Sequence, residues 1–442
     1  MSEFLRKYLG NDSQRPPVRF RCAFRNTIYD AMRSRGWRET DSETEWDIFW
    51  CDKEWMSEYF DKFRFQAHQR INHFRSHYEL TRKDLLVRNL RRHRRQLERD
   101  GKLEEAQSFN VCPTTFLLPL EYSMFVEEYR KTPNSLWIMK PVGRSQGKGI
   151  FLFERLSQIS EWKSDTRWKK TTSVPSRKEK SLDEPSQAEA YVCQRYIEDP
   201  LLIGGKKFDL RLYAFVTSYS PLTVYIHRGG FARMSHTYYS VEEEHKDNLC
   251  MHLTNVAIQR SSQEYDETSG GKWPLHKVKQ FLVARYGEPC VNELMHQIEQ
   301  VILKPLIAVS KVMIHDKHCC ELYGYDVIVD TKLKPWLLEV NASPSLTASN
   351  AADYEFKLGL VDDVLTIIDM EKYLTGAEKQ VGEFILIYKG GPVNEIPQEC
   401  ATRSHLGAAA SRKRSLKHLA KTLAVAQASE KLPAEERDLL TT

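Results

Sequence analysis

The sequence predicts a protein of the mixed α/β (α+β) class, and three observations support that prediction. Residues 18–50 show a strand pattern, a helix pattern and a second strand pattern in turn, as expected for a small leading β-α-β unit. From Phe116 onward short apolar runs typical of strands become frequent. Residues 275–286 and 291–312 instead carry the apolar spacing of helices in a central body. Both kinds of element are therefore expected throughout the chain.

Composition sets limits on the class of protein. Of the 442 residues, 41% are hydrophobic and 11% aromatic, which is enough for one large core or several smaller ones. The longest candidate membrane span, residues 301–314, is interrupted by Lys304 and Lys311, and the first residues lack the apolar core of a secretory signal. Nine cysteines without CxxC spacing favour reduced thiols over disulfides or a zinc site, and Cys319 and Cys320 are expected to pack. We therefore expect a cytoplasmic protein without a membrane partner.

The leading unit and the segment after it have distinct patterns. Residues 18–24 alternate like a strand, Asn26 is a suitable N-cap for a helix ending at Gly36, and residues 46–50 form a second apolar strand. Residues 82–99 follow as an amphipathic helix with a strongly basic face, and Thr81-x-x-Asp84 matches a capping box. That face is either simply solvated or binds an acidic polymer. We disfavour nucleic acid as its partner, since no aromatic stacking platform accompanies it.

A glycine loop lies between two predicted strands. Residues 136–141 and 149–153 are apolar and flank Gly143-Arg-Ser-Gln-Gly147-Lys148-Gly149. A Walker-type loop needs four residues between its glycines, a Ser or Thr after the lysine and a following helix, and this segment has none of these. Glycine still allows backbone N–H groups to approach phosphates, and Lys140 and Lys148 add positive charge. The segment is either a nucleotide-covering loop or a plain hairpin turn.

Two further strands carry polar residues. Residues 191–197 form an apolar run containing Gln194, and the end of this run is suited to offering backbone groups to an adenine edge. In residues 206–213 one strand face is wholly polar, while the other carries Phe208, Leu210 and Leu212. Arg211 and, after the strand at residues 222–226, Arg233 are candidates to bind a substrate carboxylate. The polar face consists of Lys207, Asp209, Arg211 and Tyr213.

The segment 323–341 predicts a hairpin that assembles a hard-metal site. Residues 331–334 form a loop of hairpin length, so that Asp330 faces Pro335 and Asp326 faces Glu339. Side chains alternate along a strand, so Glu339 and Asn341 share a face with Asp326 opposite. Oxygen ligands of this kind favour Mg²⁺, which keeps water and nucleotide phosphate in the rest of its shell. The alternative interpretation is a solvated acidic face.

Taken together in their order, these motifs resemble the tubulin tyrosine ligase-like family, and the polyglutamylase members most closely. The resemblance spans roughly residues 37–368 and implies an ATP-grasp fold with a small N-terminal α/β domain. The matching motifs are Lys140-Pro with Gln146-Gly-Lys-Gly-Ile150, residues 194–197, Lys207-Phe-Asp-Leu-Arg211, His252-Leu-Thr-Asn255, Gly324-Tyr-Asp326, and Glu339-Val-Asn-Ala-Ser-Pro-Ser345.

The resemblance also implies roles for individual residues. Lys148, Arg211 and Arg233 are assigned to catalysis, and Arg233 with Lys357 to the incoming amino acid. Asp326, Glu339 and Asn341 are assigned to Mg²⁺. The residues assigned to ATP are Lys140, Gln146, Gly147, Lys148, Gly149, Gln194, Arg195, Tyr196, Ile197, Lys207, Asp209, Thr254 and Asn255.

The activity implied is that of a tubulin polyglutamylase. ATP first converts an acceptor glutamate side chain of a tubulin tail into an acyl phosphate, which the amine of a free glutamate then attacks. Tubulin or microtubules, engaged through their acidic tails, and possible accessory subunits are the expected partners. Cytoplasm, cytoskeleton, cilium or flagellum and basal body are the expected locations. A glycine or tyrosine ligase of the same fold, or a microtubule-binding subunit active only in a complex, remain alternatives.

These expectations divide the chain into four segments. Residues 1–105 form the N-terminal α/β domain with the basic helix. Residues 106–200 form a central ATP-grasp subdomain, in which the charged, polar residues 163–187 are a mobile insertion. Residues 201–375 form the C-terminal ATP-grasp subdomain with the metal site. Residues 376–442 form a basic, partly disordered tail.

Overall fold

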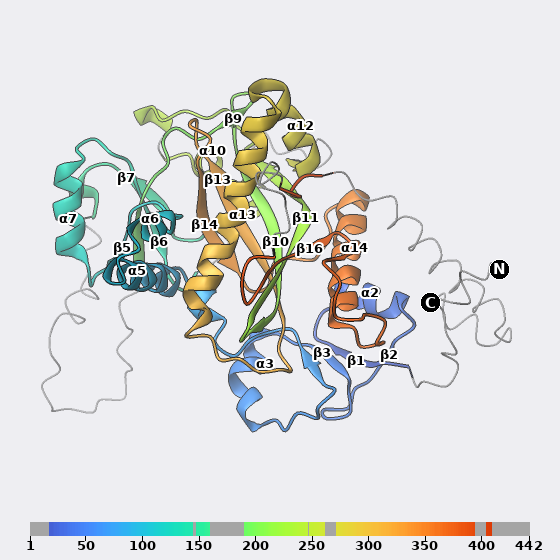
Figure 1. Ribbon diagram of the computed structural model, residues 1–442. Coiled ribbons are helices and arrows are strands. Elements are labelled where there is room, and N and C mark those ends of the chain that lie inside the picture. The colour runs from blue at the N-terminus through green and yellow to red at the C-terminus, as the bar shows by residue number, and fades with distance from the viewer. Residues whose placement is uncertain are drawn as a thin grey trace, which may run out of the picture.

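The structure is a computed structural model that describes residues 17–144, 147–159, 190–245, 247–260, 271–393 and 404–408. Within these ranges three β-sheets and the helices between them form a mixed α/β protein (Figure 1). The predicted insertion at residues 163–187 lies outside the described residues, as does Gln146 of the glycine loop. This arrangement confirms the mixed α/β class predicted from the sequence.

The amino-terminal unit is a four-stranded parallel sheet in the order β2-β1-β3-β4. Its helix begins as predicted, because the Asn26 side chain accepts a hydrogen bond from the backbone N–H of Ile28 at 3.0 Å. Beyond the helix Gly36 has a φ of +76°, a conformation that favours glycine. The elements are β1 (Arg19–Cys22), α2 (Thr27–Ser34), β2 (Arg38–Glu39), β3 (Ile48–Trp50), α3 (Lys53–Glu58) and β4 (Arg70–Ile71).

The central eight-stranded sheet has the path β14-β13-β10-β11-β16-β15, with β9 and β12 pairing with β10 and β11. The side chains of its two longest strands point alternately into two hydrophobic cores. Leu210 and Leu212 of β10 pack with helices α12 and α13, whereas Tyr213 and Phe215 pack with α14 and the amino-terminal unit. The elements are β9 (Leu202–Ile203), β10 (Lys206–Tyr219), β11 (Leu222–Met234), β12 (Lys272–Pro274), α12 (Leu275–Tyr286), α13 (Glu288–Ser310), β13 (Glu321–Val329), β14 (Pro335–Asn341), α14 (Ala351–Ile368), β15 (Gln380–Val381) and β16 (Phe384–Lys389).

The third sheet is antiparallel, in the order β5-β8-β6-β7, and the glycine loop connects two of its strands as predicted. This sheet lies to one side of the central sheet, beside α5 and α6 (Figure 1). Its core consists mainly of aromatic side chains such as Phe125 and Trp137. The strands of this sheet are β5 (Thr115–Leu118), β6 (Trp137–Pro141), β7 (Phe151–Phe153) and β8 (Tyr191–Arg195). The α-helices not yet named are α4 (Tyr78–Thr81), α5 (Lys83–Arg99), α6 (Leu103–Ser108), α7 (Tyr122–Lys131), α10 (Leu249–His252) and α11 (Val256–Gln259).

The basic helix is present, but the predicted capping box is wrong. Thr81 ends the preceding helix α4, where its hydroxyl donates to the carbonyl of His77 at 3.0 Å. Asp84 instead accepts two hydrogen bonds of 2.7 Å from the guanidinium of Arg82, the N-cap residue. Because Thr81 is part of the short helix α4, its side chain does not cap α5, although the sequence spacing of Thr81 and Asp84 suggests a capping box.

The hairpin of residues 323–341 has the predicted pairing of Asp326 with Glu339, but its turn differs. Val329, and not Asp330, faces Pro335. Asp330 belongs to the turn, where its carboxylate accepts backbone hydrogen bonds of 2.9 Å from Lys332 and Lys334. A register shift between Asp326 and Val327 then restores the pairing of the two acidic residues.

The expected tail begins later than residue 376. Residues 384–389 form β16, which pairs with β11 inside the central sheet, because the apolar run Phe384-Ile-Leu-Ile-Tyr covers an otherwise open strand. Residues 404–408 are also described, while 394–403 and 409–442 lie outside the described residues.

The remaining expectations concern cysteines and membrane spans. The eight cysteines in the described ranges are free, and Cys319 and Cys320 are buried in the core, which confirms their packing role. Among the helices that the structure describes, none has the length and apolar character needed to cross a bilayer.

Candidate active site

A cavity of about 620 Å³ lies between the antiparallel sheet and the polar face of β10. Its size falls within the range of pockets that enclose small ligands. Seventeen of the site residues chosen from the sequence line it, although they come from separate segments of the chain. They are Lys140, Gly147, Lys148, Gln194, Arg195, Tyr196, Ile197, Lys207, Asp209, Arg211, Arg233, Thr254, Asn255, Asp326, Glu339, Asn341 and Lys357.

One end of the cavity, here called the lysine end, is formed by Lys140, Gln194, Tyr196, Lys207 and His252. Lys140 Nζ donates to Gln194 Oε1 at 2.8 Å, and Lys207 Nζ donates to the Tyr196 hydroxyl at 2.7 Å and the His252 carbonyl at 2.8 Å. These acceptors are neutral. Within the described ranges neither lysine has a carboxylate within ion-pair distance, so the lysine end holds positive charge without a paired anion.

Burial changes the ionisation of this end. It lowers the pKa of Lys140 to about 8, with the nearby Lys83 acting in the same direction, and that of Lys207 to about 7, against the attraction of Asp209. Burial, with the nearby Lys207, also lowers the pKa of His252 to about 4. An added anion would favour the charged lysines, so the lysine end is suited to bind phosphate groups.

The glycine loop forms the roof of the cavity. Gly147 and Gly149 have φ values of +76° and +75°. A side chain at position 147 would also collide with Ile258, whose Cδ1 lies 2.2 Å from the place of the missing Cβ. Glycine is therefore required both by conformation and by close approach. Lys148 is exposed and lines the cavity, whereas Gly149 lies beside it, next to Pro141.

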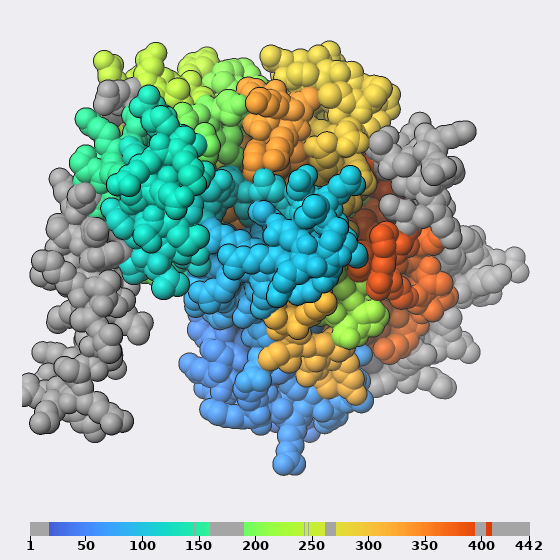
Figure 2. All heavy atoms as spheres, turned by 60° about the vertical axis from the view of Figure 1, so that its left-hand side comes forward, coloured from blue at the N-terminus to red at the C-terminus, as the bar shows by residue number. Residues whose placement is uncertain are grey.

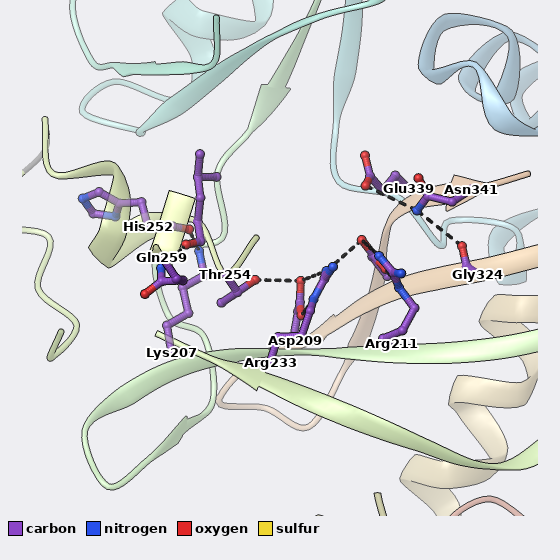
Figure 3. Close-up of polar contacts among 12 residues, drawn as sticks. Lys207, Asp209, Arg211, Arg233, His252, Thr254, Gln259, Gly324, Glu339 and Asn341 are labelled. Carbon is purple, nitrogen blue, oxygen red and sulfur yellow. Dashed lines mark hydrogen bonds and ion pairs between the residues drawn. The ribbon is translucent and has the colours of Figure 1, made fainter. Parts of the chain in front are cut away.

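The other end, here called the carboxylate end, contains Asp209, Arg211, Arg233, Asp326, Glu339 and Asn341. Strand register places Asp209 opposite Arg233 and Arg211 opposite Asp326. Arg233 bridges the two aspartates, through Nε to Asp209 at 2.7 Å and Nη2 to Asp326 at 2.7 Å, and Arg211 Nε lies 2.6 Å from Asp326 (Figure 3). Thr254 donates to Asp209 at 2.7 Å. Two acids and two bases thus alternate in one buried network.

Asp326 is ionised in this network. Burial by itself raises the pKa of a carboxyl group, but the charges of Arg211 and Arg233 outweigh it and hold the pKa of Asp326 well below its usual range. The stem of Arg211 packs closely beside Gly324, where an added Cβ would lie 3.5 Å from Arg211 Cδ and only 2.8 Å from Pro344 Cβ. The glycine thus allows β13, Arg211 and the loop after β14 to meet.

The donor set at this end fits a hard cation. Glu339 Oε2 already lies 3.2 Å from a cation, the Lys83 ammonium, and Asn341 uses only its Nδ2 for the long contacts to Glu339 and the Gly324 carbonyl. Its Oδ1 takes part in neither contact, so two carboxylates and an amide oxygen line one cavity. Throughout the described ranges, this end of the cavity included, histidine, cysteine and acidic residues form no group of three suited to a metal, and the third oxygen here comes from an amide.

A second basic group lies next to the carboxylate end. Lys357 Nζ donates to the Thr347 carbonyl at 2.6 Å and to Asp353 at 2.9 Å, and Lys272 Nζ donates to the same carboxylate oxygen at 2.9 Å. Burial and the neighbouring positive charges outweigh Asp353 and lower the pKa of Lys357. With two lysines against one carboxylate, this region has an excess of positive charge.

Sequence reasoning missed three lysines of the cavity wall, namely Lys53, Lys83 and Lys272. Lys83 was included only in the basic helix, of which it is the first residue. Lys272 lies on the short strand β12, which pairs with β11 next to Arg233. None of the three has a local motif, and only their position on the cavity wall identifies them.

Comparison with known proteins identifies the family of this chain. A model of the tubulin-tyrosine ligase family matches residues 62–376. The chain is 47% identical over 436 residues to a probable tubulin polyglutamylase TTLL9 of Rattus norvegicus, covering 93% of this chain and 94% of the relative. It is 40% identical over 392 residues to a probable alpha-tubulin polyglutamylase Ttll1 of Tetrahymena thermophila, covering 84% and 92%.

A human tubulin polyglutamylase TTLL6 is 33% identical over 377 residues, which cover 81% of this chain and 38% of the relative. The family match includes the whole cavity except its amino-terminal rim, since all lining residues from Lys83 to Lys357 lie inside residues 62–376. The chain belongs to the tubulin-tyrosine ligase family.

Proposed function

We propose that this chain is a tubulin polyglutamylase, an ATP-dependent ligase that adds glutamate to glutamate side chains of tubulin tails. The observation that carries the proposal is the single cavity that joins unpaired buried lysines to a carboxylate and amide set and to a second basic group. Phosphate, metal and amino-acid carboxylates each find complementary groups there. Relatives named as tubulin polyglutamylases support the choice of acceptor.

The lysine end and the glycine loop would bind ATP. Lys140, Lys148 and Lys207 provide positive charge for its phosphates, and residues 194–197 form the wall next to them, suited to the adenine edge. Thr254, which is fixed by Asp209, and Asn255 line the same wall. Since phosphoryl transfer depends mainly on positioning and charge stabilisation, these residues would account for much of the first step.

Asp326, Glu339 and Asn341 would hold Mg²⁺. When bound, the ion would neutralise charge on the transferring phosphoryl group. The residues themselves act in two ways in its absence: Asp326 fixes Arg211 and Arg233, and Glu339 fixes Lys83 at the cavity wall.

The incoming amino acid would bind beside the carboxylate end. Arg233 keeps its Nη1 group outside the three hydrogen bonds to the aspartates, and Lys357 and Lys272 lie on the same side of the cavity. Glutamate has two carboxylates, and a charge-assisted hydrogen bond contributes about 1.5–3 kcal/mol. The excess of basic groups here therefore favours glutamate over glycine or tyrosine.

The acidic tubulin tail would approach along a groove outside the cavity. This arginine groove is lined by Arg88, Arg91, Arg92, Arg95, Arg99, Leu117, Leu120 and Glu121. Arg91 is fixed to Glu121 at 2.8 Å, whereas Arg88, Arg92 and Arg95 are exposed and have no acidic partner in the described ranges. Figure 2 looks onto this side of the molecule, where the light-blue α5 and the teal α7 lie beside each other. Exposed arginines attract acidic polymers over several ångströms.

The organisation that accompanies this function is an ATP-grasp fold. Residues 1–105 would form the N-terminal domain, 106–200 the central subdomain, and 201–375, together with the strand β16 at residues 384–389, the C-terminal subdomain with the metal site. We further propose that the protein works at the cytoskeleton, including cilia, flagella and basal bodies, and with accessory subunits. The tubulin named in its relatives supports the cytoskeletal location.

Mass spectrometry of tubulin tails tests the proposal. Purified protein is incubated with tubulin, ATP and Mg²⁺, and with glutamate, glycine or tyrosine in separate reactions. We expect mass increments of one or more glutamates that depend on ATP. Increments from glycine alone would overturn the choice of amino acid. Activity that appears only after cell extract is added would identify a subunit that depends on a complex.

A further inference from the structure

A chain of polar side chains runs from the protein interior to the cavity wall. Glu321 Oε1 lies 2.8 Å from Nδ1 of His73, and Nε2 of the same imidazole lies 3.4 Å from Oγ of Ser343. The side chains of Glu321 and His73 are 0% and 2% exposed, whereas Ser343 is exposed and lines the cavity. A carboxylate, an imidazole and a hydroxyl in this order form an arrangement able to move a proton.

Three distant segments build this arrangement. Ile71 of β4 forms a parallel bridge with Cys319, through hydrogen bonds of 2.8 Å to the His318 carbonyl and 3.0 Å from the Cys320 N–H. His73 and Glu321 follow this bridge directly, and Ser343 follows the end of β14. Backbone pairing thus fixes both sides of the contact between His73 and Glu321.

The hydrogen bonds determine which nitrogen of His73 carries a hydrogen. Glu321 also accepts from the Phe74 N–H at 3.1 Å and from the Tyr323 hydroxyl at 2.8 Å, so its carboxylate acts throughout as an acceptor. His73 therefore donates through Nδ1, and Nε2 offers its lone pair to the Ser343 hydroxyl.

His73 is the basic side chain that faces Glu321. No lysine or arginine of the described ranges forms an ion pair with Glu321, so a positively charged imidazole would be its only cationic partner. The titratable groups around this pair include Tyr323, which donates to Glu321, and His77, whose ring centroid is 5.5 Å from that of His73. Lys53, Cys51, Cys319, Cys320 and Tyr219 lie farther out and also interact with His77 or Glu321. Burial lowers the pKa of His77, which keeps that ring neutral. Glu321 can therefore stabilise the positive charge that forms on His73 when Ser343 passes it a proton.

Ser343 lies at the carboxylate end of the cavity. It precedes Pro344, which packs against Gly324 and beside the stem of Arg211, and the same cavity wall continues to Thr347 and Lys357. These are the groups next to which the incoming amino acid would bind.

We propose that Ser343, supported by His73 and Glu321, accepts a proton from the ammonium group of the incoming glutamate. The inference rests on the proposed ligase function. The C–N bond forms while the bond between the acyl carbon and the phosphate oxygen breaks. One ammonium proton passes through Ser343 Oγ to His73 Nε2 and returns through the exposed Ser343 hydroxyl to solvent after the product leaves, and the second leaves with the phosphate as hydrogen phosphate. Ser343 is thus a catalytic residue, and His73 and Glu321 are positioning residues.

Two nucleophiles distinguish this role from a structural one. Hydroxylamine is uncharged at neutral pH and attacks acyl phosphates without a base, giving a hydroxamate, whereas glutamate must first lose a proton. The matched variants Ser343→Val and Ser343→Thr have side chains of the same shape, and only Ser343→Thr keeps the hydroxyl. Both reactions are measured at saturating ATP with tubulin as acceptor.

We expect Ser343→Val to lower the rate of glutamate addition by roughly 10²-fold, the lower range of acid–base catalysis. Hydroxamate formation should stay within about twofold of the wild-type rate, and Ser343→Thr should restore most glutamate addition. Equal losses with both nucleophiles, or no loss with glutamate, would overturn the relay alone. Failure of the wild-type protein to form any hydroxamate would instead overturn the acyl-phosphate chemistry itself.

Discussion

The two ends of the cavity handle buried charge in opposite ways. At the lysine end, Lys140 and Lys207 are held by neutral oxygen atoms, and burial lowers their pKa values. At the carboxylate end, Arg211 and Arg233 are held by Asp209 and Asp326 in a network without excess charge. The lysines of the first end have no carboxylate partner in the described ranges, whereas the arginines of the second are already paired with carboxylates. This difference predicts that removing a lysine weakens anion binding with little change in stability, whereas removing a carboxylate partner of the arginines also lowers the free energy of unfolding.

The largest effect is expected at the two carboxylates proposed to hold Mg²⁺. Asp326→Ala and Glu339→Ala should each lower the turnover of glutamate addition by at least roughly 10² to 10³, because each would remove a proposed metal ligand. Only Asp326→Ala should also lower the free energy of unfolding, by about 3–5 kcal/mol, since it leaves two buried guanidinium groups without their shared partner. Kinetic assays and urea unfolding measure the two effects. Equal stability losses in both variants would contradict the contrast between a buried network and the partly exposed pair of Glu339 with Lys83.

The second effect concerns ATP affinity. Lys207→Met should raise the Kd for ATP by roughly 10- to 100-fold, the equivalent of one lost charge-assisted hydrogen bond. The free energy of unfolding should change by no more than about 1.5 kcal/mol, because no charge is left unpaired. Calorimetric titration with ATP and urea unfolding test this. Lys277→Met, on the exposed surface of α12, is the control and should alter neither quantity. A stability loss as large as that of Asp326→Ala would mean that Lys207 belongs to the structural network.

The third effect is a dependence of ATP binding on pH. Lys207 and Lys140, with pKa values of about 7 and about 8, are charged below these values and neutral above them. Phosphate favours the charged forms, so affinity should fall as pH rises from 7 to 9, by up to tenfold per unit for each lysine. Proton uptake on binding is measured by calorimetry in buffers of different ionisation enthalpy, and Lys207→Met should take up fewer protons. Binding without proton uptake would contradict the depressed pKa values.

The smallest effect is expected at the arginine groove, where charge is exposed. Replacing Arg88, Arg92 and Arg95 together by glutamate should weaken binding to tubulin about tenfold at low salt and much less at high salt, because solvent ions screen exposed charges. Turnover at saturating tubulin should not change. Arg285→Glu, on the exposed surface of α12, is the matched control. Co-sedimentation with microtubules at several salt concentrations makes the comparison, and a loss that is independent of salt would exclude a simple electrostatic role.

Local patterns predicted much of this architecture. Asn26 and Gly36 mark a real helix, the strand-loop-strand arrangement of the glycine loop is present, and residues 275–286 form a helix with the predicted limits. These features depend on neighbours in the sequence, through capping, glycine conformation and apolar spacing. The predicted capping box at Thr81 is wrong because Thr81 belongs to the short helix α4, where its hydroxyl donates to the His77 carbonyl.

Local patterns do not predict which distant segments of the chain pair with each other. The hairpin was found because its two strands are adjacent in sequence, yet its turn is one residue longer than expected and only a register shift keeps Asp326 opposite Glu339. Arg211 was placed on a polar face, but its position opposite Asp326 requires β10 to pair with β13 across more than one hundred residues. Likewise, β16 was assigned to the tail because nothing nearby indicates its pairing with β11.

The sequence by itself identified most of the polar residues that line the cavity, because charged residues and glycines at strand spacing can be recognised without knowing their partners. Tertiary structure alone decided their charge state. Burial depresses the pKa of Lys207, the two arginines keep Asp326 ionised, and His73 meets Glu321 and Ser343 from three separate segments. The physical reason is that electrostatic interactions depend on distance in space and on exclusion of water, and neither quantity is set by order along the chain.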